Sequence, residues 1–158
     1  MFRKKRLCVR RGLRKNSEGI LTKHLYRYDR EDKLGKKIDA KYYWFTPDLE
    51  LAKSYSHPEL GIGKFYSAKI NLKNPLVVDC KNNRYSNLYF GNCKFSRKFT
   101  KPESIQFANT NGIALRAKNE GFDGVIFLNV KENDRDISTT SVCVFSLNFI
   151  EQFEEINV

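Results

Sequence analysis

The amino-acid sequence predicts an α+β fold, because strand-like segments outnumber helix-like ones and the helices are short. Residues 63–72 alternate between two faces with a period of two, which is the pattern of a half-buried strand. Residues 122–128 and 140–145 are apolar runs rich in β-branched side chains, which is typical of buried strands. The helix-like segments, after Thr46 and over 111–119, span only a few turns each.

The first part of the chain contains strand formers separated by turns. Residues 6–13 are rich in strand formers, and we expect a first strand there. Residues 20–28 alternate apolar and polar side chains, which predicts a strand or a short amphipathic helix. Residues 29–37 are highly charged and predict an exposed loop, and residues 42–45 predict another strand.

A helix is expected directly after this last strand. Thr46 is a suitable N-cap, and Pro47 suits the first helical position. Leu51, Ala52 and Tyr55 recur on one face, which we expect to pack inward. The His-Pro pair that follows is expected to end the helix.

The second half of the chain alternates strands with loops and one clearer helix. Gly121 follows that helix as a C-terminal stop signal. The expected elements are a strand over 63–72, a strand over 76–79, an irregular segment over 80–100, a helix start over 102–107, a helix over 111–119, strands over 122–128 and 140–145 with a polar loop over 130–138 between them, and a short strand or helix over 147–154.

The chain is strongly basic. Lysine and arginine total 29 against 18 aspartates and glutamates, which gives a net charge of +11. Residues 1–15 contain eight basic residues and no acid. Such a surplus favours polyanionic partners, either nucleic acid or the phosphates of a dinucleotide, although a basic patch also serves solubility alone.

The cysteines and apolar runs argue against several other classes. The four cysteines form no CxxC pair and the two histidines are isolated, so the sequence has no zinc-site pattern. We expect reduced thiols, no metal and a cytoplasmic setting. No apolar run in the sequence is long enough to span a membrane, and no signal-peptide core follows the basic N-terminus.

The order of these segments resembles a known family. YYWFTPDLELAKSYS over 42–56 joins a strand to a helix, and GFDGVIFLN over 121–129 is a buried strand with polar residues at its ends. An Arg-Gly pair at Arg11, INLKNPLVVD over 70–79 and VCVFSLNFI over 142–150 complete the order. The pattern resembles the small ADP-ribosyltransferase domains of phages and other mobile bacterial elements.

This resemblance covers roughly residues 7–151 and implies a fold and a donor substrate. The implied fold is the ADP-ribosyltransferase-like split β-sandwich with short peripheral helices, in a single domain over 1–158. The implied donor is NAD, and the Arg-Gly opening points to the class whose site residues are Arg, Ser or Thr, and Glu.

The chemistry explains why the family needs those residue types. Cleavage of the bond between nicotinamide and ribose develops positive charge on the ribose, as in glycoside cleavage. A carboxylate stabilises that charge and activates the acceptor. An arginine matches the oxygens of the diphosphate with its forked donors, and a hydroxyl orients the ribose and the acid.

The resemblance assigns these roles to residues of the two motifs. Arg11, followed by Gly12, is the expected NAD-binding pair, with Arg10 as the alternative. Thr46 is the hydroxyl of the second motif, although it would also serve as a simple helix N-cap. The rings expected beside NAD are Tyr43, Trp44 and Tyr55. The alternative, for one of the first two and for Tyr55, is that the ring packs in the core.

The catalytic acid is the position at which this sequence departs from the usual pattern. Residues 138–141, directly before Val142, contain no acid, although the superfamily usually carries glutamate there. Relatives with a similar buried strand show an acid three residues after its asparagine, which predicts Glu132 here. Asp134 and Asp136 are alternatives in the same loop, and Asn129 lies where some relatives carry an acid.

The sequence therefore predicts an NAD-dependent mono-ADP-ribosyltransferase, acting as a toxin or mobile-element effector on nucleic acid (RNA or DNA) or on an acidic protein target. An antitoxin or inhibitor protein is a further possible partner, and no membrane is expected. The basic N-terminus and the interleaved cations and rings over 84–99 suit single-stranded nucleic acid. The alternative is a non-catalytic, basic nucleic-acid-binding module on a degenerate transferase fold.

Overall fold

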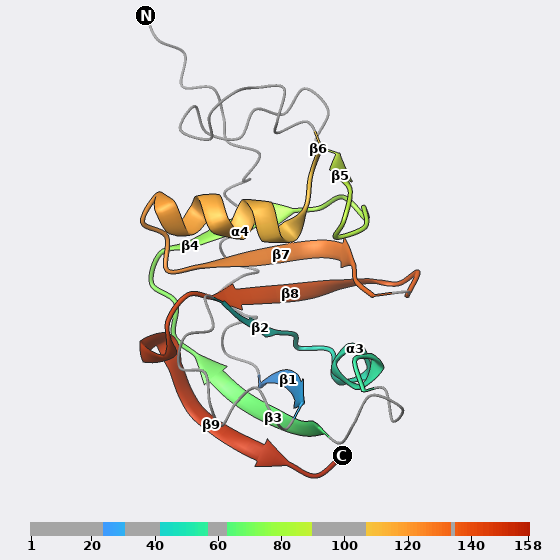
Figure 1. Ribbon diagram of the computed structural model, residues 1–158, viewed down its shortest axis with the longest axis vertical. Helices are drawn as coiled ribbons and strands as arrows, with labels where there is room; N and C mark the ends of the chain where they lie inside the picture. The colour runs from blue at the N-terminus through green and yellow to red at the C-terminus, as the bar shows by residue number, and fades with distance from the viewer. Residues whose placement is uncertain (1–23, 31–41, 57–62, 90–106, 134) are drawn as a thin grey trace, which may run out of the picture.

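The computed structural model describes residues 24–30, 42–56, 63–89, 107–133 and 135–158 (Figure 1). The strand expected over 6–13 lies outside these residues, as do Arg10, Arg11 and Gly12. The described elements are β1 (Leu25–Arg30), β2 (Tyr43–Phe45), α3 (Leu49–Ser54), β3 (Gly63–Ile70), β4 (Pro75–Asp79), β5 (Leu88–Tyr89), β6 (Phe107–Ala108), α4 (Thr110–Asn119), β7 (Gly124–Lys131), β8 (Ser138–Val144), a 3-10 helix (Leu147–Phe149) and β9 (Ile150–Ile156).

The strands form two main sheets that pack as a sandwich. One sheet has the order β1-β3-β9 and is antiparallel throughout. The other has the order β2-β8-β7-β4, in which β4 runs parallel to β7 and the remaining pairs are antiparallel. In Figure 1, α4 covers the outer face of the second sheet and the first sheet lies across its inner face. Strands β5 and β6 pair separately.

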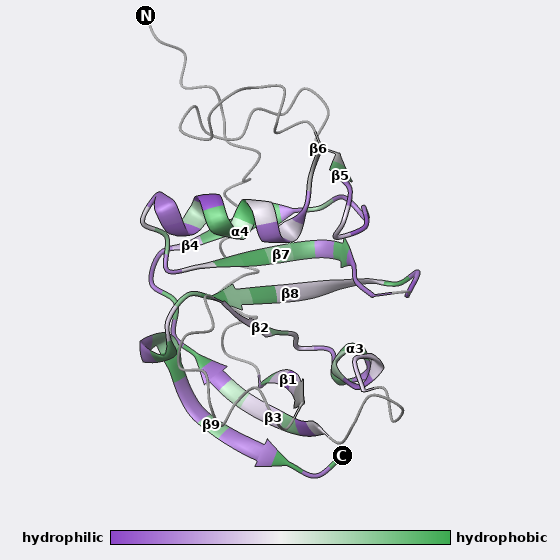
Figure 2. Ribbon diagram, viewed as in Figure 1, coloured by the Kyte–Doolittle hydropathy of each residue, from purple (hydrophilic) through white to green (hydrophobic). Residues whose placement is uncertain are grey.

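The alternation of side chains along β7 builds the hydrophobic core on both faces of its sheet. Val125 and Phe127 belong to the cluster that includes the buried side of α4. Ile126 and Leu128 belong to the cluster shared with the β1-β3-β9 sheet. Figure 2 accordingly shows β7 as strongly hydrophobic, whereas β9 is largely hydrophilic. Because β7 is covered on both sides, its apolar run is continuous rather than alternating.

The fold class predicted from the sequence is confirmed, with two sheets and few short helices in the described part of the chain. Of the segment 20–28, residues 25–28 are in β1, so the strand alternative is the right one for them. The segment over 147–154 contains both a 3-10 turn and the start of β9. None of the helices that the structure describes is long and apolar enough to cross a membrane.

Several element boundaries predicted from the sequence are wrong. Residues 29–30 belong to β1 and not to a loop, and Phe107 belongs to β6 and not to a helix start. The polar loop expected over 130–138 is shorter at both ends, because β7 continues to Lys131 and β8 begins at Ser138. In each case pairing with a neighbouring strand overrides the polar composition of the segment.

The N-cap of α3 also differs from the prediction. The cap is Asp48, whose carboxylate accepts a hydrogen bond from the Leu51 backbone N–H at 3.1 Å. Thr46 lies two residues earlier and bonds elsewhere, so its expected role as the cap is wrong. Aspartate and threonine are both good caps, and the position at which the chain leaves β2 decides between them.

Asp123 and Gly124, at the start of β7, both have structural roles. A Cβ at Gly124 would lie 2.5 Å from the carbonyl oxygen of Cys143, so only glycine allows β7 to approach β8 this closely. The Asp123 carboxylate accepts hydrogen bonds from the backbone N–H groups of Lys73 and Asn74 at 2.6 and 2.9 Å. These bonds fix the turn before β4 against the start of β7.

Candidate active site

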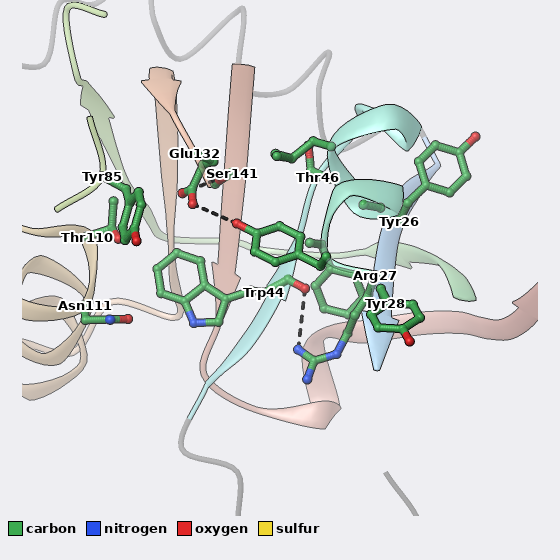
Figure 3. A pocket seen from close by; sticks show the side chains of 14 residues that line it. Tyr26, Arg27, Tyr28, Trp44, Thr46, Tyr85, Thr110, Asn111, Glu132 and Ser141 are labelled. Atoms are coloured by element: carbon green, nitrogen blue, oxygen red, sulfur yellow. Dashed lines mark hydrogen bonds between the residues drawn. The ribbon is translucent and has the colours of Figure 1, made fainter. Parts of the chain in front are cut away.

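A pocket of about 280 Å³ lies where β1, β2 and α3 meet the ends of β7 and α4 (Figure 3). Both sheets and both helices contribute side chains to it, and most of these are aromatic or hydroxyl-bearing. The lining residues are Tyr26, Arg27, Tyr28, Trp44, Phe45, Thr46, Leu51, Ala52, Tyr55, Tyr85, Thr110, Asn111, Glu132 and Ser141. Glu132 is the one carboxylate among them.

Glu132 is held by two hydroxyl groups, one on each carboxylate oxygen. The Tyr55 hydroxyl donates to Oε2 at 3.0 Å, and the Ser141 hydroxyl donates to Oε1 at 3.0 Å. Glu132 follows the last residue of β7 and is only 7% exposed. A buried carboxylate with both oxygens bonded has a fixed orientation, which a positioned catalytic acid or base requires.

The environment of Glu132 shifts its acidity in two opposing directions. Burial raises the pKa of the Glu132 carboxyl above its ordinary value, and the hydrogen bonds from Ser141 and Tyr55 lower it in part. Burial and the neighbouring Glu132 raise the pKa of Tyr55, so its hydroxyl stays protonated and remains a donor. Although 41% of the Tyr55 surface is exposed, its hydroxyl is the end that reaches the carboxylate.

Helix α3 is fastened to the segment around Glu132 at both of its ends. At the N-terminal end, the Asp48 carboxylate pairs with the Arg135 guanidinium at 3.3 Å. At the C-terminal end, the side-chain amide of Asn133 donates to the carbonyl and hydroxyl oxygens of Ser54 at 3.0 and 3.1 Å. These contacts hold α3, and Tyr55 directly after it, in register with the end of β7.

Thr46 lies between the pocket and the backbone of β8. It is 5% exposed, and its hydroxyl donates to the Thr140 carbonyl at 2.8 Å and accepts from the Asp48 backbone N–H at 3.1 Å. A hydroxyl has one hydrogen and two lone pairs, so Thr46 retains one lone pair that can accept a hydrogen bond from a ligand.

The two neighbouring rings of β2 point in different directions. Trp44 lines the pocket and packs on Phe127 with ring centroids 5.8 Å apart. Tyr43 is 5% exposed and belongs to the core between the two sheets. Adjacent side chains of a strand face opposite sides, and here Trp44 borders the pocket while the Tyr43 ring packs in the core.

Arg27 is a pocket cation that the sequence reasoning passed over. It lies on β1 between two tyrosines that also line the pocket, and its guanidinium donates to the Trp44 carbonyl at 3.4 Å. The guanidinium carbon also lies 5.7 Å from the ring centre of Tyr43. In Figure 3, the Trp44 ring lies between Arg27 and Asn111, and Glu132 lies above that ring. The signal available in the sequence was an arginine with a tyrosine on each side of it in a strand-like segment.

Neither Asp136 nor Asn129, the described alternatives to Glu132, lines this pocket. Asp136 is exposed and forms an ion pair with Lys131 at 3.0 Å. Asn129 is exposed within β7, where its side-chain amide donates to the Asp79 carboxylate at 3.1 Å. Asp134 lies outside the described residues. Within the residues that the structure describes, no group of three or more His, Cys, Asp or Glu side chains is placed to hold a metal ion.

Comparison with known proteins gives one match. A family model described as ADP-ribosyltransferase in polyvalent proteins matches residues 22–155. No curated protein and no solved structure matches the chain. The match includes every residue that lines the pocket and begins after Arg11 and Gly12.

Proposed function

Because this chain belongs to the family of ADP-ribosyltransferases in polyvalent proteins, whose donor substrate is NAD, we propose that it transfers one ADP-ribose from NAD to a nucleic acid, RNA or DNA. The observation that carries the proposal is Glu132, a buried carboxylate oriented by two hydroxyls inside an aromatic-lined pocket. The fold agrees with the membership, since it is the split β-sandwich that the resemblance implied.

Glu132 has the chemical properties that the reaction needs. When the bond between nicotinamide and ribose breaks, C1′ becomes positively charged, and an ionised carboxylate beside it stabilises that charge. The same carboxylate then accepts the proton of the attacking group. Only the ionised form does either, so the hydrogen bonds that offset the effect of burial on its pKa also support activity.

The other pocket residues supply the contacts to NAD in this proposal. Thr46 accepts a hydrogen bond from a ribose hydroxyl through its remaining lone pair. Trp44 borders the nicotinamide, because its ring lies beside Glu132 in the pocket (Figure 3). Arg27 binds the diphosphate with its forked donors. Arg11 and Gly12 remain the pair suggested by the Arg-Gly motif, outside the described residues.

The size of the pocket indicates which part of NAD it takes. Sites for drug-sized ligands usually measure ~300–1,000 Å³, and this pocket, at about 280 Å³, is at the lower end. It suits the nicotinamide riboside half of NAD and leaves the adenosine half outside. That half contains the bond to be cleaved, so the pocket encloses the reacting atoms.

The net charge of the chain supports nucleic acid as the class of acceptor. A net charge of +11 on a chain of 158 residues favours a polyanion, and most of this excess lies outside the described residues. An acidic protein surface would be attracted in the same way, and it is the competing acceptor.

The decisive experiment measures nicotinamide release from NAD and transfer of label from ³²P-NAD to RNA, DNA or protein. The wild-type protein should do both, and Glu132→Gln should lower both by at least about 100-fold, the size of effect typical for a general acid or base. Asp136→Asn is the matched control, because it neutralises an exposed carboxylate of the same loop. Salt-sensitive nucleic-acid binding without any NAD cleavage would instead support the non-catalytic binding module.

A toxic effector role is proposed together with the activity. Modification of nucleic acid would slow the growth of a producing cell, and a partner antitoxin would be needed to silence it. Expression of the wild-type chain should therefore inhibit growth, and expression of Glu132→Gln should not. If cells that produce equal amounts of the wild type and of Glu132→Gln grow equally well, the toxin role is wrong. That result would not contradict the proposed enzymatic activity.

A further inference from the structure

We infer that Tyr85 and Asn111 form the acceptor wall of the pocket, and that the acceptor placed there is an unstacked nucleobase of a single strand. This inference rests on the proposed function and specifies the substrate class of the same site. The acceptor wall consists of Tyr85, Thr110 and Asn111, which line the pocket on the side away from β1 (Figure 3).

The acceptor wall is rigidly tied to the catalytic carboxylate. The backbone N–H of Tyr85 donates to the Lys131 carbonyl at 2.9 Å, and Lys131 directly precedes Glu132. The backbone N–H of Thr110 donates in turn to the Tyr85 carbonyl at 3.0 Å. Two backbone hydrogen bonds thus connect the end of β7 to the first turn of α4. A group bound on this wall is held at a constant position relative to Glu132.

The two sides of the pocket differ in charge. Arg27, the cation that suits the diphosphate of NAD, lies on the β1 side, and Trp44 and Glu132 lie between it and the acceptor wall (Figure 3). The donor therefore occupies the β1 side, and the acceptor must approach C1′ from the other side. There the wall offers an aromatic ring, a hydroxyl and a carboxamide, and none of these three residues carries a charge.

These neutral groups select the class of acceptor. A carboxylate acceptor would lose its hydration at the wall and be repelled by Glu132, whereas a guanidinium acceptor would meet no charged partner on the wall itself. A nucleobase fits, because its face stacks on an aromatic ring and a carboxamide matches the paired donors and acceptors of its edge. The Asn111 carboxamide and the Tyr85 hydroxyl make no hydrogen bond to the described part of the chain.

The transfer step needs only NAD, the base, Glu132 and water. The bond between C1′ and the nicotinamide nitrogen breaks, and its electron pair leaves with neutral nicotinamide. A nitrogen of the base forms the new bond to C1′, and the proton it carried passes to the Glu132 carboxylate and then to water. The products are nicotinamide, the ADP-ribosylated base and one proton.

The test compares two acceptors of one enzyme, water and a nucleobase. The protein is incubated with ³²P-NAD and a mixed-sequence single-stranded DNA oligonucleotide, or the same sequence as RNA, and free ADP-ribose and labelled oligonucleotide are both measured. We expect Tyr85→Ala and Asn111→Ala to lower the ratio of transfer to hydrolysis about tenfold or more, as loss of a stacked base contact does. Tyr85→Phe keeps the ring and should retain most of the ratio, and Asn119→Ala, an exposed asparagine at the other end of α4, should leave it unchanged.

Each contrary result has a distinct meaning. If the alanine variants lose hydrolysis and transfer equally, the wall binds NAD and the assignment is overturned. The assignment is also overturned if the alanine variants have the same ratio of transfer to hydrolysis as the wild type. It is overturned as well if the wild type labels only protein. In both cases the proposed cleavage of NAD still stands. If the wild type releases no nicotinamide, the proposed function itself falls, and this assignment falls with it.

Discussion

The Tyr55 hydroxyl donates a hydrogen bond to Glu132 Oε2 over 3.0 Å, although the two residues are 77 positions apart in the chain. The bond crosses from the end of α3 to the end of β7. Ser141, nine residues after Glu132, occupies the other oxygen. The orientation and the acidity of the carboxylate therefore depend on how α3 docks against the second sheet.

Tyr55→Phe should shift the pH dependence of the reaction. The Tyr55 bond lowers the pKa of Glu132 against the effect of burial, so its loss raises that pKa. The acid limb of kcat/KM for nicotinamide release should then move to higher pH, with a loss of about tenfold or more on the limb, in keeping with about 1.5–3 kcal/mol for a hydrogen bond to a charged group. Tyr42→Phe removes a buried hydroxyl that has no partner in the described residues and should leave the limb in place. An unmoved limb in Tyr55→Phe would contradict the role of Glu132 as the titrating group.

Glu132→Gln should stabilise the protein at neutral pH. The pKa of Glu132 is higher in the folded state than in the unfolded state, so the folded protein binds the proton more tightly. Its contribution is complete below the unfolded pKa, ~4.3, and is lost as pH rises through the folded pKa. Glutamine is neutral at every pH and avoids that loss.

The free energy of unfolding of Glu132→Gln should therefore exceed that of the wild type by about 0.5–2 kcal/mol at neutral pH, the usual gain on relieving a strained site. The excess should shrink towards about pH 4, where the wild-type carboxyl is protonated in both states. Urea unfolding at both pH values measures the difference. A variant less stable than the wild type at neutral pH would show that the charged carboxylate stabilises the fold.

Asn129→Val should disturb the site from three residues away. Asn129 has a φ of 52°, and the pairing of β7 with β8 shifts register between Phe127 and Val130. A β-branched residue disfavours this left-handed conformation by about 1–2 kcal/mol. We expect that loss of stability, together with reduced nicotinamide release, because the bulge sets the direction of the chain into Glu132. Asn129→Gly is the matched variant, and it should retain activity because glycine adopts this φ without strain.

Arg27→Ala should raise the KM for NAD by about tenfold or more, as expected for loss of a charge-assisted contact to phosphate. Arg27→Lys should recover little of this, because an ammonium cannot reproduce the forked donors of a guanidinium. The matched control is Arg116→Ala, since Arg116 lies in the last turn of α4 and does not line the pocket. If the KM for NAD is unchanged in Arg27→Ala, Arg27 does not bind the diphosphate, and Arg11 is the cation to test next.

Most strands and both described helices could be predicted from local patterns, since period, β-branching and stop signals act within a few residues. The predictions of element boundaries and of the helix cap failed where a contact with a neighbouring strand decides the local structure. Lys131 and Ser138 are polar, yet they extend β7 and β8 because those two strands pair with each other there. Thr46 has good capping chemistry, but Asp48 caps α3 because Thr46 bonds to the backbone of β8.

The sequence by itself determined the α+β class, the family resemblance and Glu132 as the candidate acid, because these depend on residue order and spacing. Only the tertiary structure decided what surrounds Glu132. It placed Trp44 in the pocket and Tyr43 in the core, brought Ser141 and Tyr55 to the carboxylate, and added Arg27 and Tyr85 to the lining. The physical reason is that hydrophobic periodicity depends on residues close together in the sequence. Hydrogen bonds between residues far apart in the chain depend on the order and packing of the sheets.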